Sequence, residues 1–334
     1  MAKPILYIVA TGGTIASRYN PKTGEPTGAA SAEELAATVP ALTEFAEIRA
    51  LQHSNVTSDI IDTRTVFRLR DVLRNVLAEE RVAGAVVTHG TATLEETAYL
   101  LELTLGSEKP VVVTGAMRNI IEKDADGPRN IFYSALVALH PETRGRGVLV
   151  CLNGEIHSAQ EAIKSHANRV NSYISRDGGP VGAVFSEGVV FFSRPERRLF
   201  LDVDHVKENV QLVTMAQGAN DLLLRACIRE KVDGIVVEGV GAGNVNLPFY
   251  YAIRDALKVR IPVVVGVRIL AGTGYHAKGH EGSLQSMIQH GAISAGYLSG
   301  AKARVLLMVG LAHTQDQNEL REIFRRAAGP SLPV

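Results

Sequence analysis

The sequence predicts an α/β protein with a larger N-terminal α/β domain, built on a mainly parallel sheet, and a smaller C-terminal α/β domain. Its length of 334 residues exceeds what one hydrophobic core usually organises. Short runs of β-branched residues alternate with helical patterns, as in β-α-β units. This alternation changes near Gly178–Gly182. We therefore expect domains at residues 1–192 and 211–334, joined by a charged linker at residues 193–210.

The predicted strands are short apolar runs bounded by turn-forming residues. The first, Ile5–Ala10, is too short to cross a membrane and no cleavage-type sequence follows it, so we expect a buried strand rather than a signal peptide. Two runs, Val181–Phe185 and Gly188–Phe192, are spaced as in a β-hairpin. The other expected strands are Val82–Thr88, Pro110–Gly115, Gly147–Leu152, Gln211–Met215, Gly234–Val237 and Ile261–Val267.

Helices are expected where apolar residues recur at three- and four-residue spacing. Ser31 and Glu34 have the Ser-x-x-Glu spacing of a capping box, which predicts the start of a helix. The other expected helices are Thr65–Ala78, Glu96–Leu103, Asn130–Leu139 and Asn220–Arg229.

Charge and cysteine usage exclude several classes of partner. Lys and Arg together equal Asp and Glu at 35 each, which gives no electrostatic case for nucleic acid. With no membrane segment or signal peptide predicted, we expect a cytoplasmic protein with no membrane partner. Cys151 and Cys227 both lie in apolar runs and are expected to be core thiols. His89 has no second His or Cys at ligand spacing, so no metal site is predicted.

Two threonine-containing loops follow predicted strands, where parallel sheets place their ligands. Thr11–Thr14 follows the first strand, and Thr88–Thr93 begins at the end of the second. Glycines in these loops allow close approach of a ligand, and the hydroxyls are potential nucleophiles that need a base. Lys164 could be that base if burial lowered its pKa. Structural interpretations remain open: a tight turn, Thr91 as a helix cap, a solvated Lys164 and a structural His89.

A third glycine-rich loop, Gly239–Asn244, superficially resembles a dinucleotide-binding loop. It lacks the third glycine at its required place, and no strand-ending acid follows at about twenty residues. No organic cofactor is therefore expected.

Taken together, these segments resemble the bacterial L-asparaginase/glutaminase family over nearly the whole chain. Several independent motifs occur in the same order as in the family. The matching runs are Ala10–Ala16, Val87–Thr91, Leu94–Ala98, Val113–Arg118, Ala125–Pro128, Gly239–Gly241 and Ala301–Leu307.

The resemblance implies hydrolysis of a small amide through a threonine acyl-enzyme, without metal or organic cofactor, in a homotetramer of two dimers. Thr14 would be the nucleophile, and Thr91 and Lys164 a second catalytic group. Thr57 and Ser58 match the segment that holds the substrate α-carboxylate. The substrate-binding candidates are Thr57, Ser58, Gly90, Ala92, Tyr19, Asn244 and Glu281.

Three positions depart from the family pattern. Ala92 replaces an aspartate that orients the lysine and binds the substrate α-ammonium. The family's glutamate from the neighbouring subunit has no clear equivalent, and Glu281 is the nearest acid, out of register. Tyr19 is the only nearby candidate for the family's first-loop tyrosine, while Glu25 lies nearer the expected register. A buried ammonium without its carboxylate costs about 3–5 kcal/mol, or two to four orders of magnitude in affinity.

Three interpretations follow from these departures. In the first, the protein hydrolyses a small amide, lactam or imide that lacks a free α-ammonium. In the second, it is a conventional asparaginase or glutaminase that uses a substitute acid such as Glu281. In the third, it is a binding homologue without catalysis, which the retention of Thr14, Thr91 and Lys164 disfavours.

Overall fold

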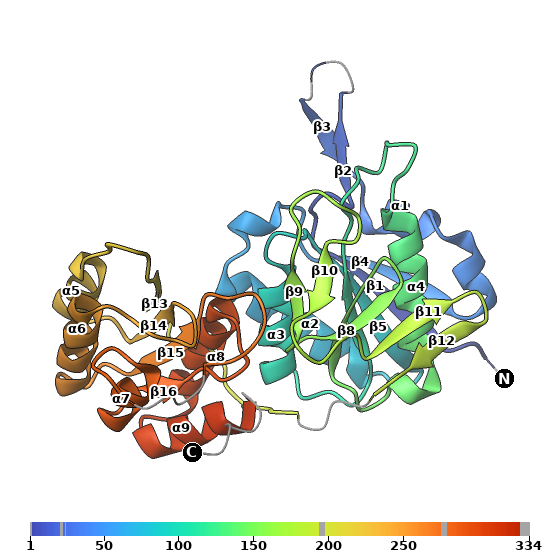
Figure 1. Cartoon of the computed structure of the whole chain (residues 1–334). Coiled ribbons are helices and arrows are strands. Elements are labelled where there is room, and N and C mark those ends of the chain that lie inside the picture. Colours follow the sequence, from blue (N-terminus) through green and yellow to red (C-terminus); the bar gives the residue numbers. More distant parts are fainter. Residues whose placement is uncertain (1, 21–22, 24, 194–197, 275–278, 328–334) are drawn as a thin grey trace. The chain divides into compact units, whose positions relative to one another are not determined.

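The chain folds into two compact units, Met1–Arg198 and Leu199–Val334 (Figure 1). The computed structural model describes residues 2–20, 23, 25–193, 198–274 and 279–327. Residues 194–197 of the expected linker, and residues 275–278 and 328–334 of the expected C-terminal domain, lie outside the described residues. Both units are α/β, and the predicted fold class, with a larger first part and a smaller second part, is confirmed.

The first unit is built on an eight-stranded sheet in the order β12-β11-β8-β7-β6-β5-β1-β4. The five strands from β7 to β4 are parallel, and β8, β11 and β12 extend the sheet with antiparallel pairing. The parallel strands are β1 Ile5–Ala10, β4 Glu47–Gln52, β5 Val82–Thr88, β6 Val111–Thr114 and β7 Val148–Leu152. The antiparallel strands are β8 Glu155–Ser158, β11 Gly182–Phe185 and β12 Gly188–Phe191, and the last two form the predicted hairpin.

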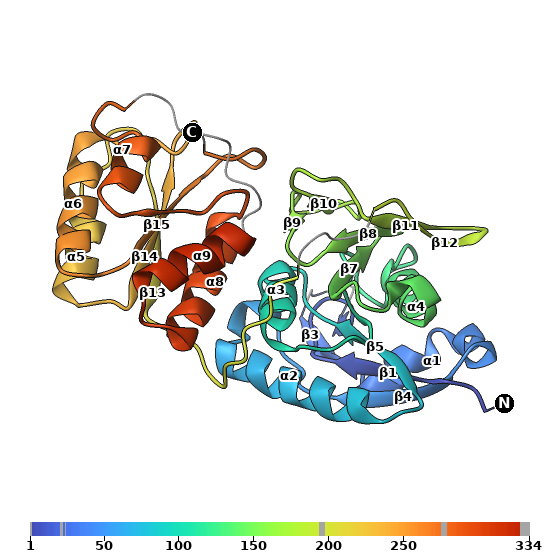
Figure 2. The ribbon, with the colours of Figure 1, turned by 90° about the horizontal axis from the view of Figure 1, so that it is seen from below.

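Helices cover both faces of this sheet (Figure 2). On one face, α1 (Ala32–Ala37) and α4 (Gly127–Leu139) share a hydrophobic cluster with alternate residues of the strands. On the other face, α2 (Thr63–Ala78) packs on β5 and against α3 (Leu94–Thr104). The central strands are therefore buried on both sides, which explains their continuous apolar sequences. The capping box at Ser31 is present, with both reciprocal hydrogen bonds.

Several small elements were not predicted. The missed strand β4 carries the charged residues Glu47 and Arg49, ends in the polar Gln52 and is an edge strand of the sheet, so it lacks the apolar run of a central strand. Two separate ribbons were also missed. They consist of β2 (Ser17–Tyr19) with β3 (Pro26–Ala29), and β9 (Ala162–Lys164) with β10 (Tyr173–Ser175). Lys164 therefore does not directly follow β7, because β8 intervenes and Lys164 ends β9.

The second unit contains a four-stranded parallel sheet in the order β13-β14-β15-β16. One face is covered by α5, α6 and α7, which share a single hydrophobic cluster, while α8 and α9 pack together. The strands are β13 Val210–Thr214, β14 Gly234–Gly239, β15 Val263–Val267 and β16 Ile293–Ser294. The helices are α5 Leu222–Arg229, α6 Leu247–Lys258, α7 Leu284–Gln289, α8 Gly300–His313 and α9 Gln317–Ala327.

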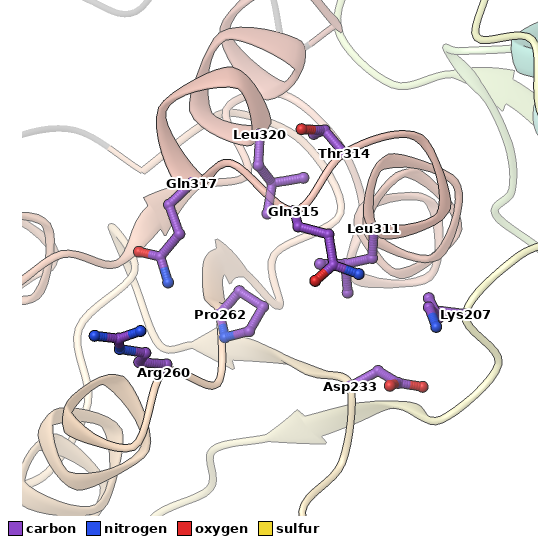
Figure 3. A pocket seen from close by; sticks show the side chains of 9 residues that line it. All are labelled: Lys207, Asp233, Arg260, Pro262, Leu311, Thr314, Gln315, Gln317 and Leu320. Carbon is purple, nitrogen blue, oxygen red and sulfur yellow. The ribbon is translucent and has the colours of Figure 1, made fainter.

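A cavity of about 200 Å³ lies in the second unit, at the amino ends of β14 and β15 (Figure 3). Its walls mix charged, polar and apolar side chains: Lys207, Asp233, Arg260, Pro262, Leu311, Thr314, Gln315, Gln317 and Leu320. Parallel sheets bind ligands at the carboxyl ends of their strands. The cavity therefore lies at the amino ends of the strands, opposite to the carboxyl ends where a site is expected.

The two cysteines are buried free thiols, as predicted. Burial raises the pKa of Cys151 to about 12, so it remains protonated at neutral pH. Within the described part of the chain, no helix is both long and apolar enough to cross a membrane.

One ion pair ties the end of the first unit to α3. The guanidinium of Arg198 lies 3.2 Å from Glu102, and their side chains are 24% and 12% exposed. Glu102 also accepts a 2.6 Å hydrogen bond from the Val148 amide of β7. Burial raises the pKa of Glu102, while Arg198 lowers it.

We expect Arg198→Met to lower the free energy of unfolding by about 1–3 kcal/mol at neutral pH, because it leaves the Glu102 carboxylate nearly buried without its cation. Urea unfolding measures this change. The loss should shrink as the pH falls, since a protonated Glu102 no longer needs the cation. Arg18→Met, which removes the exposed pair with Glu34, is the control and should change stability little.

Candidate active site

The two threonine loops lie side by side at the carboxyl ends of β1 and β5. These strands are paired in parallel with Ala10 opposite Thr88. The Thr11 amide and the Thr11 hydroxyl both donate to the Thr88 carbonyl, at 3.1 and 2.9 Å. Both predicted loops therefore lie at the carboxyl ends of neighbouring strands, as the strand pattern indicated.

Glycine backbone brings the loops into direct contact. Gly13 has a φ of +84°, and a Cβ atom on it would lie 2.3 Å from the Gly90 Cα. Gly12 has a φ of +108°, and a Cβ atom on it would lie 2.4 Å from the Val56 carbonyl oxygen. Side chains larger than hydrogen do not fit at these positions. Gly13, the neighbour of Thr14, therefore packs directly against the loop that carries Thr91.

The hydroxyl-rich segment at Thr57 and Ser58 lies beside the same strand ends. Ser58 is buried against Gly90, and its hydroxyl accepts a 3.2 Å hydrogen bond from the Ala92 amide. The Thr93 hydroxyl donates to the Ser58 carbonyl at 2.7 Å. Three predicted segments therefore meet here, and the backbone at Ala92 is fixed without any contribution from its side chain.

Lys164 and Thr91 form the central contact of the site. The Lys164 Nζ donates to the Thr91 Oγ1 at 2.7 Å. The Tyr173 hydroxyl, from β10, donates to the Thr91 carbonyl at 2.8 Å and so holds the backbone of the loop. Thr91 is not a helix cap, because the N-cap of α3 is Thr93. The solvated-lysine interpretation is therefore wrong for Lys164, which is engaged with a hydroxyl.

The electrostatics of Lys164 favour a base. Partial burial lowers the pKa of its ammonium, and the nearby carboxylate of Glu95 opposes this change by raising it. A lysine with a lowered pKa is neutral more often near physiological pH, and a neutral amine accepts a proton. The pair therefore has the geometry of a hydroxyl with its activating base.

His89 is structural. Its ring is fully buried, with Nδ1 2.8 Å from the Gly90 carbonyl and Nε2 3.1 Å from the Thr97 hydroxyl. Burial lowers its pKa to about 4, so the ring is neutral. Among the described residues, no group of three His, Cys, Asp or Glu side chains is placed to hold a metal ion.

Thr14 and Tyr19 lie on the first loop. Thr14 is half-buried in a turn, where its carbonyl accepts from the Ser17 amide, and none of the described residues hydrogen-bonds its hydroxyl. Tyr19 ends β2, on a ribbon that extends away from the sheet (Figure 1), and is 38% exposed. Among the described residues, no hydrogen bond joins Tyr19 to the threonine loops, and its substrate-binding role stays a prediction.

Asn244 and Glu281 belong to the second unit. Asn244 closes a tight turn after β14 through paired backbone hydrogen bonds with Val240. The carboxylate of Glu281 accepts a 2.9 Å hydrogen bond from the Tyr251 hydroxyl. Their expected roles in substrate binding stay predictions.

Sequence reasoning missed four residues of the site. Glu95 accepts a hydrogen bond from the Lys164 amide, and Tyr173 supports Thr91 as described. Met117 lies 3.4 Å from the Thr91 hydroxyl, and buried Asp126 accepts from the Met117 amide at 3.1 Å. Glu95, Met117 and Asp126 lie in runs already singled out in the sequence, but no pattern there showed these contacts.

Comparisons with known proteins cover both units. Residues 5–197 match the family described as "Asparaginase, N-terminal", and residues 209–324 match "Glutaminase/Asparaginase C-terminal domain". The chain is 33% identical to "L-asparaginase 2" of Bacillus subtilis (strain 168) over 330 residues, covering 96% of this chain and 86% of the relative. It is 32% identical over 329 residues to "Probable L-asparaginase periplasmic" of Haemophilus influenzae, covering 96% and 92%.

A solved structure is also similar. It is the crystal structure of a probable cytoplasmic L-asparaginase from Campylobacter jejuni, with a TM-score of 0.89 and 32% identity. The match covers 97% of this chain and 100% of that one.

We expect Gly13→Ala to lower the free energy of unfolding by about 1–3 kcal/mol or more, because the added Cβ meets Gly90 and the backbone is in the left-handed region. Urea unfolding measures the loss, and hydrogen exchange should show faster exchange in residues 11–17. Gly178→Ala is the matched control, since a Cβ there meets open space. Equal stability of the two variants would mean that the loops do not pack through Gly13.

Proposed function

The chain belongs to the asparaginase family, and we propose that it hydrolyses a small amide, lactam or imide without a free α-ammonium, through a threonine acyl-enzyme. Enzymes of this type are hydrolases of carbon–nitrogen bonds other than peptide bonds. The observation that carries the chemistry is the 2.7 Å hydrogen bond between the Lys164 amine and the Thr91 hydroxyl.

The proposed reaction uses Thr14, Thr91 and Lys164. The neutral Lys164 amine takes the Thr91 proton while Thr91 takes the proton of Thr14. The Thr14 oxygen bonds to the amide carbonyl carbon, the carbon–nitrogen bond breaks, and the nitrogen leaves with the proton returned by Lys164. Water then attacks the threonine ester, which releases the acid and restores the Thr14 hydroxyl. A competing assignment, attack by Thr91 itself, is favoured by the direct contact of Thr91 with its base.

The substrate class follows from Ala92. Its methyl group is exposed and flanks Thr91, in a loop that Ser58 holds in place. A methyl group at this point offers an ammonium neither a negative charge nor a hydrogen-bond acceptor. Binding a substrate whose ammonium is buried without a partner costs about 3–5 kcal/mol of binding free energy. A substrate without the ammonium avoids that cost.

The second candidate is conventional hydrolysis of L-asparagine. It is favoured by the names of the relatives, which are L-asparaginases. It is also favoured by Glu281, whose carboxylate would reach the substrate α-ammonium from a neighbouring subunit. A homotetramer without cofactor is part of both candidates. The relatives carry both periplasmic and cytoplasmic names, and we place this protein in the cytoplasm as part of the proposal.

An assay of ammonia or acid release on matched amides, with and without an α-amino group, distinguishes the candidates. We expect the native enzyme to have the higher kcat/KM on the amide without the amino group. Ala92→Asp should raise kcat/KM for L-asparagine by about two to four orders of magnitude, because it restores a carboxylate partner. L-asparagine as the best native substrate would instead establish the second candidate.

Variants of the catalytic group supply the controls for this assay. Thr14→Ala, Thr91→Ala and Lys164→Met should each lower kcat at least about a hundredfold with the fold retained by circular dichroism. Turnover of no amide by the native enzyme would support a binding homologue and contradict the proposal.

The acyl-enzyme locates the attacking hydroxyl. After rapid acid quenching, peptide mass spectrometry should find the acyl group on the peptide that contains Thr14. An acyl group on the peptide that contains Thr91, still formed in Thr14→Ala, would move the attack to Thr91.

A further inference from the structure

We propose that Glu95 is a positioning residue for the Thr91 and Lys164 pair, which it serves by anchoring the end of β9 and by placing a negative charge beside the lysine. The inference rests on the proposed function for its chemical meaning. Its structural basis is independent of the substrate.

The anchor is a closed ring of contacts. The Thr91 loop leads directly into α3, and Glu95 lies in the first turn of that helix. The Glu95 Oε2 accepts a short hydrogen bond from the backbone amide of Lys164, the last residue of β9. The Lys164 side chain then returns to the Thr91 hydroxyl at 2.7 Å. Both ends of the lysine are therefore tied to one stretch of chain, Thr91–Glu95.

A second link stiffens the same ring. Tyr173 pairs with Lys164 across the β9 and β10 ribbon and donates its hydroxyl to the Thr91 carbonyl. The ribbon has only three residues in each strand, so it has little hydrogen bonding of its own. The bond from Lys164 to Glu95 therefore connects a small ribbon to a buried helix.

The charge of Glu95 acts on the lysine in the opposite sense to burial. Burial lowers the pKa of Lys164, and the carboxylate of Glu95 raises it. A carboxylate near the start of a helix is favoured in its charged form by the helix dipole. Glu95 therefore limits how far the lysine pKa falls and sets the pH at which the amine becomes a base.

The other titratable groups on the elements that pack against β9 belong to α3 and β10. Besides Glu95, α3 carries Glu96, Tyr99 and Glu102, and β10 carries Tyr173. Burial keeps the pKa of Tyr173 well above its usual value, so it carries no charge at neutral pH. Glu96 acts on Tyr173 but is not among the groups that shift Lys164. Glu96→Gln is therefore a matched control for Glu95→Gln.

The test measures the proton affinity of Lys164 without any substrate. Competitive acetylation modifies only neutral amines, and mass spectrometry of the peptide containing Lys164 gives its reactivity at each pH. In Glu95→Gln the amide oxygen keeps an acceptor for the Lys164 amide while the charge is lost, so the reactivity curve should move to lower pH. Glu96→Gln should leave the curve in place.

Activity provides the second readout. With whichever amide the native enzyme hydrolyses, kcat/KM should rise with pH as Lys164 loses its proton, and Glu95→Gln should move this rise to lower pH. Glu95→Ala, which removes the anchor as well, should also reduce kcat. A reactivity curve for Glu95→Gln that coincides with the native curve would overturn the proposal. Absence of amide hydrolysis with a shifted curve would instead refute only the proposed function.

Discussion

The hydrogen bond between Thr91 and Lys164 is the contact on which the proposed chemistry depends. It joins residues 73 positions apart, on a loop after a central strand and on a short ribbon outside the sheet. The amine can accept the proton of a hydroxyl 2.7 Å away only if it is neutral, so its surroundings must lower the pKa of the lysine. Burial does this, and the ring through Glu95 and Tyr173 holds the geometry while it does so.

The loops around this bond are ordered by backbone contacts more than by side chains. Gly13 against Gly90, Gly90 against Ser58, and Ser58 against the Ala92 amide form a continuous series of close approaches. Each needs either a glycine or a small hydroxyl, which explains why the sequence is so rich in these residue types at the strand ends. Because the backbone holds the loops in place, the exposed side chain of Ala92 does not contribute to their structure.

The sequence predicted the central strands closely because each is an uninterrupted apolar run buried on both faces; β1 and β5 match to the residue. It missed β4, whose charged residues suit an exposed edge, and it missed the β9 ribbon, because three-residue strands leave no periodic pattern. In the site, likewise, the residues that lie in sequence motifs were predicted and those that act through long-range contacts were missed. Thr14, Thr91 and Lys164 lie in motifs, whereas Glu95 and Tyr173 act across 69 and 82 residues of sequence, and no local pattern reports a contact of that kind.

The fixed backbone at Ala92 has an evolutionary consequence. Because the amide of this residue, and not its side chain, binds Ser58, the loop can carry a different side chain here without refolding. Two of the four alanine codons differ from an aspartate codon at a single base. A lineage could therefore move between substrates with and without a positive charge by one point mutation, at little cost in stability, while the machinery that breaks the bond stays untouched.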